Sequence, residues 1–221
     1  MKRFVTVLGC ASAIALSSTA MAGFTVENFS DYYGQENTMY GAWDTFTNAN
    51  NAPNFADNGG NMGFAGQVFN FSGSGFLTSS GNIYDAGAPL NIHNYLTLDG
   101  VDITNAHVNV STMGTVPDFG GVLFQAVTSA GDSQFLDTSD VSMNFNQEIP
   151  GMGASMNMSW SFDLSDIAGD VTSIAFIMKA VGPHMSLDAL SLDVAYAAIP
   201  APGALALLGL AGIAGRRRRR G

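Results

Sequence analysis

The chain has 221 residues, with 18 acidic and 8 basic side chains and a formal net charge of −10 at pH 7. Between Gly23 and Ile199 there are 18 Asp and Glu residues against one cation, Lys179, a net charge of −17. A domain this acidic repels phosphate groups, which excludes nucleic acid as an expected partner.

The first 22 residues have the three-part pattern of a secretory signal peptide. Lys2-Arg3 gives a positive start, an apolar stretch runs to Leu16, and Ala20-Met21-Ala22 is a cleavage signature. We therefore expect the export machinery and signal peptidase as partners, with cleavage between Ala22 and Gly23. The only cysteine, Cys10, lies in this segment, so the mature chain would contain neither a disulfide nor a thiolate metal site.

Residues 23–198 are long enough for one domain with a sizeable core. Runs of apolar residues bounded by Gly, Asn, Asp and Pro predict short strands. Two stretches are less regular: Thr38–Thr47 is helical or a loop, and Asn48–Asn61 reads as a surface loop. In chain order, the predicted strands outside the three discussed below are Phe24–Phe29, Phe64–Phe71, Phe76–Ser80, Ala106–Ser111, Gly121–Val127 and Val171–Ala180.

A strict alternation of apolar and polar residues marks a hairpin. It covers Val141–Asn146 and Met156–Leu164, and it predicts two strands that each have one buried face and one face in solvent. The segment Gln147–Ser155 between them contains Pro and Gly, which predicts a relatively long loop. Directly after the hairpin, Asp163–Asp170 is expected to form one helical turn.

The last strand changes phase. Met185, Leu187 and Ala189 alternate with polar residues, and the apolar positions then shift to Leu190, Leu192 and beyond. Since a slip of one residue turns every later side chain to the opposite face, we expect a β-bulge near Ala189-Leu190. Burial of both faces is the alternative. The elements together predict an all-β, antiparallel β-sandwich.

The C-terminal residues 199–221 read as a targeting segment. Gly203–Gly215 has no polar side chain, and as a helix it would be about 20 Å long. The apolar core of a bilayer is about 30 Å thick, so this transmembrane helix would be a marginal span. The cluster that follows stays on the cytoplasmic side and consists of Arg216, Arg217, Arg218, Arg219 and Arg220.

This ending resembles the PEP-CTERM sorting signal of Gram-negative bacteria, with Pro200-Ala201-Pro202 as the proline motif. The resemblance implies that an exosortase, a membrane protease, cuts near Pro200 and Pro202 and passes the protein from the inner membrane to the cell surface or extracellular matrix. Ala201 replaces the usual Glu, and an uncleaved membrane anchor is the alternative. The preceding stretch, "MSLDALSLDVAYAAIP", is similar to the final strand of jelly-roll-like surface domains, which implies a jelly-roll-like sandwich.

No motif for catalysis is present, since the sequence lacks a G-x-S-x-G elbow, an H-E-x-x-H motif and a P-loop. The histidines are His93, His107 and His184, and nothing local in the sequence suggests a nucleophile with a base positioned by a third group. We therefore expect no enzymatic activity. A glycosidase that uses a pair of carboxylates is a distant alternative.

Two kinds of ligand have candidate residues. No resident cofactor is expected, but calcium prefers oxygen ligands, and Asp57, Asp166 and Asp188 are the candidates for holding it. A surface polysaccharide could stack on exposed rings, for which the candidates are Tyr32, Tyr33, Tyr40, Trp43 and Tyr84. The expected function is that of an exported structural or extracellular-matrix protein, with a carbohydrate-binding module as the alternative.

Overall fold

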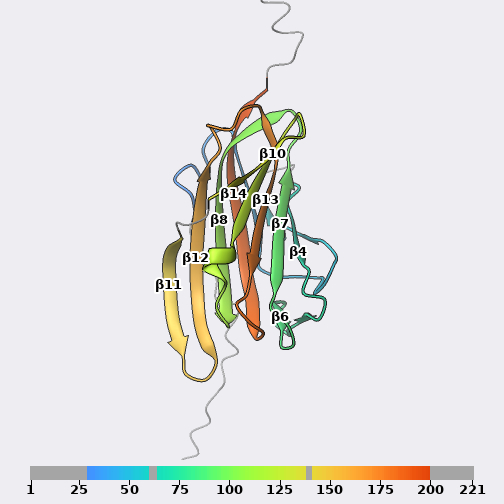
Figure 1. Cartoon of the computed structure of the whole chain (residues 1–221), viewed down its shortest axis with the longest axis vertical. Coiled ribbons are helices and arrows are strands. Elements are labelled where there is room, and N and C mark those ends of the chain that lie inside the picture. The colour runs from blue at the N-terminus through green and yellow to red at the C-terminus, as the bar shows by residue number, and fades with distance from the viewer. Residues whose placement is uncertain (1–28, 60–63, 138–140, 200–221) are drawn as a thin grey trace, which may run out of the picture.

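The computed structural model describes residues 29–59, 64–137 and 141–199 (Figure 1). Several predictions lie outside these residues: the signal peptide with Ala22 and Gly23, the strand at Phe24–Phe29 up to its last residue, and the whole sorting segment from Pro200 to Arg220. Within the described part of the chain, no helix is both long and apolar enough to cross a membrane.

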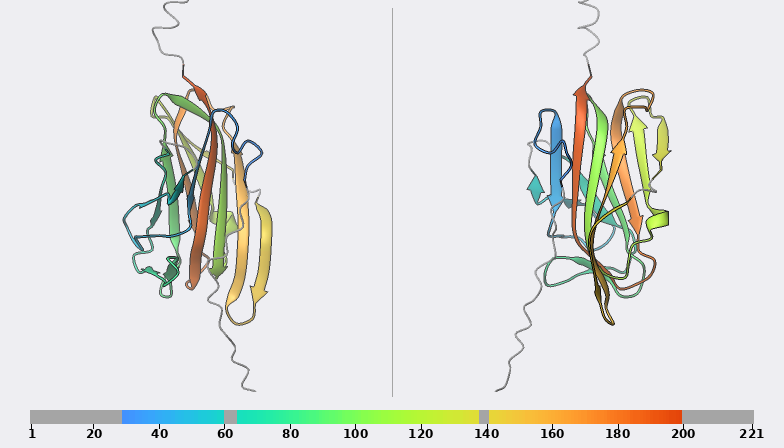
Figure 2. Two further views of the ribbon diagram at one scale, coloured as in Figure 1. Left: turned by 180° about the vertical axis from the view of Figure 1, so that it is seen from behind. Right: turned by 90° about the vertical axis from the view of Figure 1, so that its left-hand side faces the viewer.

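The described residues form two antiparallel β-sheets packed face to face (Figures 1 and 2), which confirms the predicted all-β sandwich. The larger sheet has eight strands and the smaller has six. The eight-stranded sheet contains β1 (Thr38–Trp43), β3 (Asn58–Gly59), β5 (Phe76–Leu77), β6 (Ile83–Asp85), β8 (Val101–Gly114), β11 (Ser142–Ile149), β12 (Gly153–Asp163) and β14 (Met185–Ala198).

The six-stranded sheet has the order β10-β9-β13-β7-β4-β2. Its strands are β2 (Asn54–Phe55), β4 (Gln67–Asn70), β7 (Asn91–Thr97), β9 (Leu123–Thr128), β10 (Ser133–Leu136) and β13 (Val171–Lys179). The path through the eight-stranded sheet is β11-β12-β8-β14-β1-β3, and β6 pairs with the beginning of β14. The chain passes between the sheets repeatedly, because β7 and β8, β12 and β13, and β13 and β14 lie in opposite sheets.

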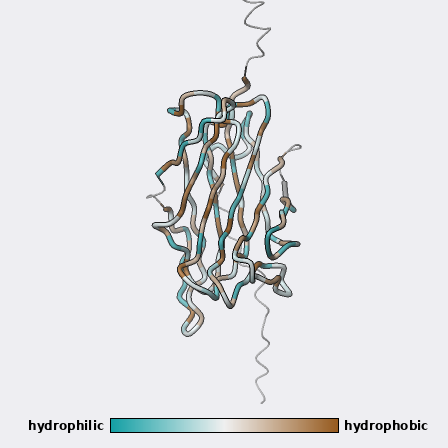
Figure 3. Tube along the Cα trace, turned by 45° about the vertical axis from the view of Figure 1, so that its right-hand side comes forward, coloured by the Kyte–Doolittle hydropathy of each residue, from teal (hydrophilic) through white to brown (hydrophobic). Residues whose placement is uncertain are grey.

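The core lies between the sheets and is built from the apolar positions that recur along the strands (Figure 3). Two aromatic pairs join the layers. Phe162 of β12 stacks on Phe124 of β9 with ring centroids 3.8 Å apart, and Trp160 lies 5.1 Å from Phe176 of β13. All four side chains are buried, so they remove large apolar areas from water and fix how the sheets align.

The predicted hairpin is confirmed as β11 and β12, but both strands are longer than expected, so the connecting loop is only residues 150–152. The expected buried face of β11 is wrong, because Met143 is 42% exposed. The expected solvent face of β12 holds for Ser161 and Asp163, which are exposed. It is wrong for Asn157 and Ser159, which are buried like Met158 on the opposite face. A bulge in β11 places Asn144 over them, and its Nδ2 donates to Asn157 Oδ1 at 2.8 Å and to Ser159 Oγ at 3.2 Å. Polar side chains can be buried here because they bond to one another.

The predicted bulge in the last strand is confirmed, one residue earlier than expected. In the pairing of β14 with β8, Leu187 lies opposite Thr112 and Ala189 lies opposite Ser111. Asp188 is therefore the extra residue in the ladder. The bulge keeps the apolar side chains in the core on both sides of the phase change, which is the function of such an insertion.

Three predictions of local structure are wrong. Thr38–Thr47 is neither a helix nor a loop throughout, since its first six residues form β1 and pair with β14. Asn48–Asn61 is not only a surface loop, because it contains the short strands β2 and β3. Asp163–Asp170 forms turns rather than a helical turn, and Asp163 Oδ1 accepts hydrogen bonds from the backbone and the hydroxyl of Ser165.

Candidate functional site

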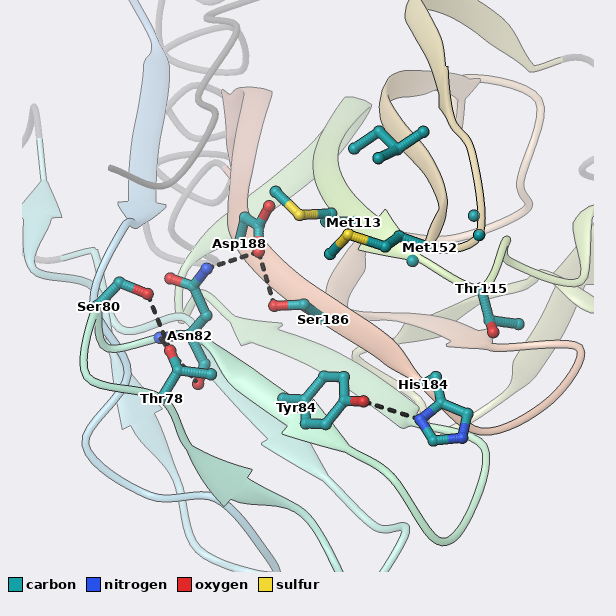
Figure 4. A pocket seen from close by; sticks show the side chains of 14 residues that line it. Thr78, Ser80, Asn82, Tyr84, Met113, Thr115, Met152, His184, Ser186 and Asp188 are labelled. Carbon is teal, nitrogen blue, oxygen red and sulfur yellow. Dashed lines mark hydrogen bonds between the residues drawn. The ribbon is translucent and has the colours of Figure 1, made fainter. Parts of the chain in front are cut away.

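A pocket of about 890 Å³ opens at one end of the eight-stranded sheet (Figure 4). It lies where β6, the beginning of β14, the end of β8 and the tip of the β11–β12 hairpin meet, at the lower end of the molecule in Figure 1. The chain therefore builds it from four segments that are distant in sequence.

Asp188, the bulge residue, forms the polar end of the pocket. Its side chain is 1% exposed, and its Oδ1 accepts hydrogen bonds from Asn82 Nδ2 at 2.6 Å and from Ser186 Oγ at 2.7 Å. Its Oδ2 and Asn82 Oδ1 have no hydrogen-bond partner among the described residues. The chain thus leaves two buried acceptors at the pocket wall unpaired, which is uncommon for buried polar atoms.

Burial raises the pKa of the Asp188 carboxyl to about 6, although the hydrogen bonds from Ser186 and Asn82 act in the opposite direction. The cause is the loss of water around the charged form. The pocket thus contains a carboxyl that changes from a neutral group to an anion close to neutral pH.

Tyr84 and His184 form a second part of the lining. The Tyr84 hydroxyl and His184 Nδ1 lie 2.8 Å apart and share a hydrogen bond (Figure 4). The edge of the Tyr84 ring packs against Phe76 of β5, with ring centroids 5.2 Å apart. His184 has a positive φ of 70°, a conformation that few residues other than glycine adopt. The turn before β14 therefore holds the imidazole in place at a cost in backbone strain.

The floor of the pocket is a close approach of three backbone segments. Gly114 and Gly153 have φ values of +94° and +97°. A Cβ at Gly114 would overlap the carbonyl oxygen of His184, and a Cβ at Gly153 would overlap the carbonyl oxygen of Gly114. Only glycine fits at both positions, so the floor depends on these two residues.

The remaining lining combines apolar and hydroxyl groups. Met113, Ile149 and Met152 supply the apolar surface, and Thr78 and Ser80 supply hydroxyl groups that bond to each other at 2.9 Å. Asp188 is the single carboxylate among the described residues that line the pocket. Hydrolysis of glycosides in the usual way uses two carboxylates, and the described lining supplies one.

The three calcium candidates lie in different surroundings. Asp57 is exposed, and its carboxylate accepts hydrogen bonds from the backbone N–H of Asp44 and, at 2.7 Å, of Thr45. Asp166 is exposed in the turns after β12, whereas Asp188 is buried in the pocket. Among the described residues, no three His, Cys, Asp or Glu side chains are grouped so that they could hold a metal ion.

The five aromatic candidates do not form one surface. Trp43 is fully buried and donates from Nε1 to the carbonyl of Asn54, and Tyr40 is 8% exposed. Tyr33 packs edge-on against Tyr40, and the Tyr32 hydroxyl donates to the backbone of β14. Tyr84 is the one candidate that lines the pocket.

Asn82, Ser186 and His184 are pocket residues that the sequence did not single out as ligand-binding. The phase change in the last strand was the one available signal, because it predicted an irregularity next to Asp188. Nothing in the sequence links Asn82 to Asp188, since 106 positions separate them.

No protein-family model matches the chain, and no curated protein matches it either.

Proposed function

We propose that this chain is an exported, non-catalytic protein of the cell surface whose β-sandwich binds an uncharged, hydroxyl-rich ligand in the pocket beside Asp188. The ligand class is a sugar unit of a surface polysaccharide. The observation that carries this proposal is the pair of buried, unpartnered acceptors, Asp188 Oδ2 and Asn82 Oδ1, in the wall of an open pocket.

The chemistry of the other walls supports a sugar. A pyranose has an apolar C–H face and a rim of hydroxyl donors, so it needs an apolar or aromatic surface and a few fixed acceptors. Met113, Met152 and the ring of Tyr84 provide the first, and Asp188 and Asn82 provide the second.

The charge of the domain supports a neutral ligand. Residues 23–199 carry a net charge of −17, which disfavours approach of an anionic polymer. At the pocket itself, the raised pKa of Asp188 shows that a negative charge is poorly solvated there. A neutral hydroxyl donor would bind without adding a second charge.

We further propose a jelly-roll-like arrangement and the sorting route expected from the termini. The last strand, β14, lies between β1 and β8, and β13 lies between β7 and β9. Strands inserted between earlier ones in both sheets are typical of jelly rolls. Signal-peptide cleavage, transient residence in the inner membrane and exosortase-type processing near Pro200 to Pro202 would place this domain on the cell surface or in the extracellular matrix.

A structural role in the matrix is the second candidate function. The observation that favours it is the exposed apolar side of the six-stranded sheet, because a structural protein has to contact other molecules over a broad surface.

A glycan array followed by calorimetry tests the binding function. We expect a neutral oligosaccharide to bind, and we expect Tyr84→Ala and Asp188→Ala to weaken its Kd at least tenfold. Tyr33→Ala is the control for loss of a tyrosine ring, because Tyr33 is 41% exposed and lies outside the pocket. An array without hits, or equal Kd values for the wild type and both pocket variants, would reject the proposal.

A further inference from the structure

The outer side of the six-stranded sheet, facing away from the core, carries an unusual set of exposed side chains. We call it the aromatic face. Phe55 is 63% exposed, Phe135 57%, Leu123 45%, Phe71 40% and Tyr95 37%. Together with Phe69 they extend from β2 at one edge of the sheet to β10 at the other. Exposed apolar patches of this extent mark interaction sites in soluble domains.

The rings of this face cross one another rather than forming a plane. Phe69 and Phe71 are parallel, with centroids 5.5 Å apart, but Tyr95 meets Phe69 at 72° and His93 meets Phe71 at 81°. A crossed array offers gaps between rings, which suit the insertion of apolar side chains. It lacks the single flat surface on which a sugar chain would stack, and Phe and Leu bring no hydrogen-bonding group.

The aromatic face also differs from the rest of the domain in charge. The six strands of its sheet contain no Asp or Glu, although the described residues include 16 of them. The strands of the other sheet contain six, from Asp85 in β6 to Asp193 in β14. Lys179, the one basic residue of the described chain, lies at the end of β13 in the acid-free sheet.

This distribution of charge indicates that the partner is a second copy of the chain. Two copies of a strongly acidic domain repel each other wherever their carboxylates meet, so an acid-free face is the side on which they can approach. Six strands about 4.8 Å apart, with central strands of about 25 Å, present on the order of 600 Å², which is close to the roughly 800 Å² per partner of a standard interface. A twofold contact would join the same face of each copy.

We infer that the protein self-associates through the aromatic face, with two six-stranded sheets packed against each other as the two sheets of the sandwich are packed internally. Sheets pack about 10 Å apart when apolar side chains interdigitate. The pocket beside Asp188 is built on the other sheet, so this contact would leave it open. The inference does not depend on the proposed sugar-binding function.

Sedimentation velocity of the full chain, expressed with its own termini and purified in the form that the cell produces, tests the inference. We expect a monomer–dimer equilibrium in the micromolar range. The double variant Phe55→Ser/Phe135→Ser should weaken it at least tenfold, whereas Met152→Ser should leave it unchanged. Met152 is 65% exposed, and it lies at the pocket, so it controls for the loss of an exposed apolar side chain.

Salt provides a second measurement. Because screening reduces the repulsion between the acidic copies, raising NaCl from 50 mM to 500 mM should strengthen the association. A wild type that is monomeric at 100 µM, or a double variant that dimerises as the wild type does, would overturn the inference. A third result would also overturn it: the wild type is monomeric and cosediments with an insoluble polysaccharide, and the double variant does not cosediment. The aromatic face would then bind sugar.

Discussion

Asn82 Nδ2 donates a 2.6 Å hydrogen bond to Asp188 Oδ1, and this contact joins β14 to the turn before β6 across 106 positions of sequence. The bond is buried, and it holds one oxygen of a carboxyl whose second oxygen faces no donor of the described chain. The polar end of the pocket is therefore a carboxyl whose pKa burial raises to about 6, against the effect of this hydrogen bond.

The first prediction concerns pH. The pKa of Asp188 is about 6 in the folded chain against 3.8 for an unperturbed carboxyl, so the folded state binds the proton more tightly than the unfolded state does. The protonated Asp188 carboxyl therefore stabilises the fold fully below pH 4, and this contribution is lost as the pH rises through 6. The difference corresponds to about 3 kcal/mol at most.

Asp188→Asn should remove this effect. We expect the variant to gain stability relative to the wild type between pH 4 and pH 8, measured by urea unfolding at each pH. If the unfolding free energies of Asp188→Asn and the wild type differed by the same amount at all pH values, Asp188 would not have the raised pKa described here.

The second prediction concerns the pocket floor. Gly114→Ala would place a methyl group against the carbonyl oxygen of His184 at a φ of +94°. We expect a loss of about 1–3 kcal/mol from the backbone conformation, with more from the overlap. Gly131→Ala has a similar φ of +89° but nothing within 4 Å, so it isolates the conformational cost.

Thermal and urea unfolding of both variants would measure this difference. If Gly114→Ala and Gly131→Ala were equally stable, the close approach of β8 to the turn before β14 would not hold in solution.

The third prediction concerns the contact between layers. Phe124→Ala removes a fully buried ring that stacks on Phe162, and we expect it to lower the free energy of unfolding by about 3–5 kcal/mol. Phe135→Ala, in the neighbouring strand but 57% exposed, should cost less than about 1 kcal/mol. Equal losses from the two substitutions, measured by urea unfolding, would show that β9 does not pack against β12 as described.

The fourth prediction concerns Asp57 and calcium. Asp57→Ala removes the acceptor of the backbone N–H groups of Asp44 and Thr45, with an expected loss of about 1 kcal/mol. Because the described carboxylates form no cluster, we expect the same melting temperature in EDTA and in millimolar calcium. A rise in melting temperature with calcium that Asp57→Ala abolishes would show that Asp57 is a metal ligand instead.

The sequence predicted the fold where each strand has one apolar and one polar face. Trp160 and Phe162 alternate with serines in β12, and the hairpin was evident from that pattern. The strand β7 was missed because its middle breaks the alternation: Asn94 is buried between Ile92 and Leu96, and Tyr95 is exposed. Alternation cannot identify a strand when a polar residue faces the core.

The candidate site was less accessible to sequence analysis. The phase change in the last strand predicted a bulge, and the bulge places Asp188, but Asn82 and His184 reach the pocket from two other elements. Their positions follow from the strand order and register of the assembled sheet, which local patterns do not determine.

The bulge residue Asp188 belongs to the pocket but is not needed for the regular pairing of β14 with β8. Since Leu187 and Ala189 pair with consecutive residues of β8, deleting Asp188 would remove this irregularity from the ladder and keep Leu190, Leu192 and Val194 directed inward. A lineage could therefore acquire or lose this carboxyl by a single-codon insertion or deletion, with the core sequence unchanged on both sides.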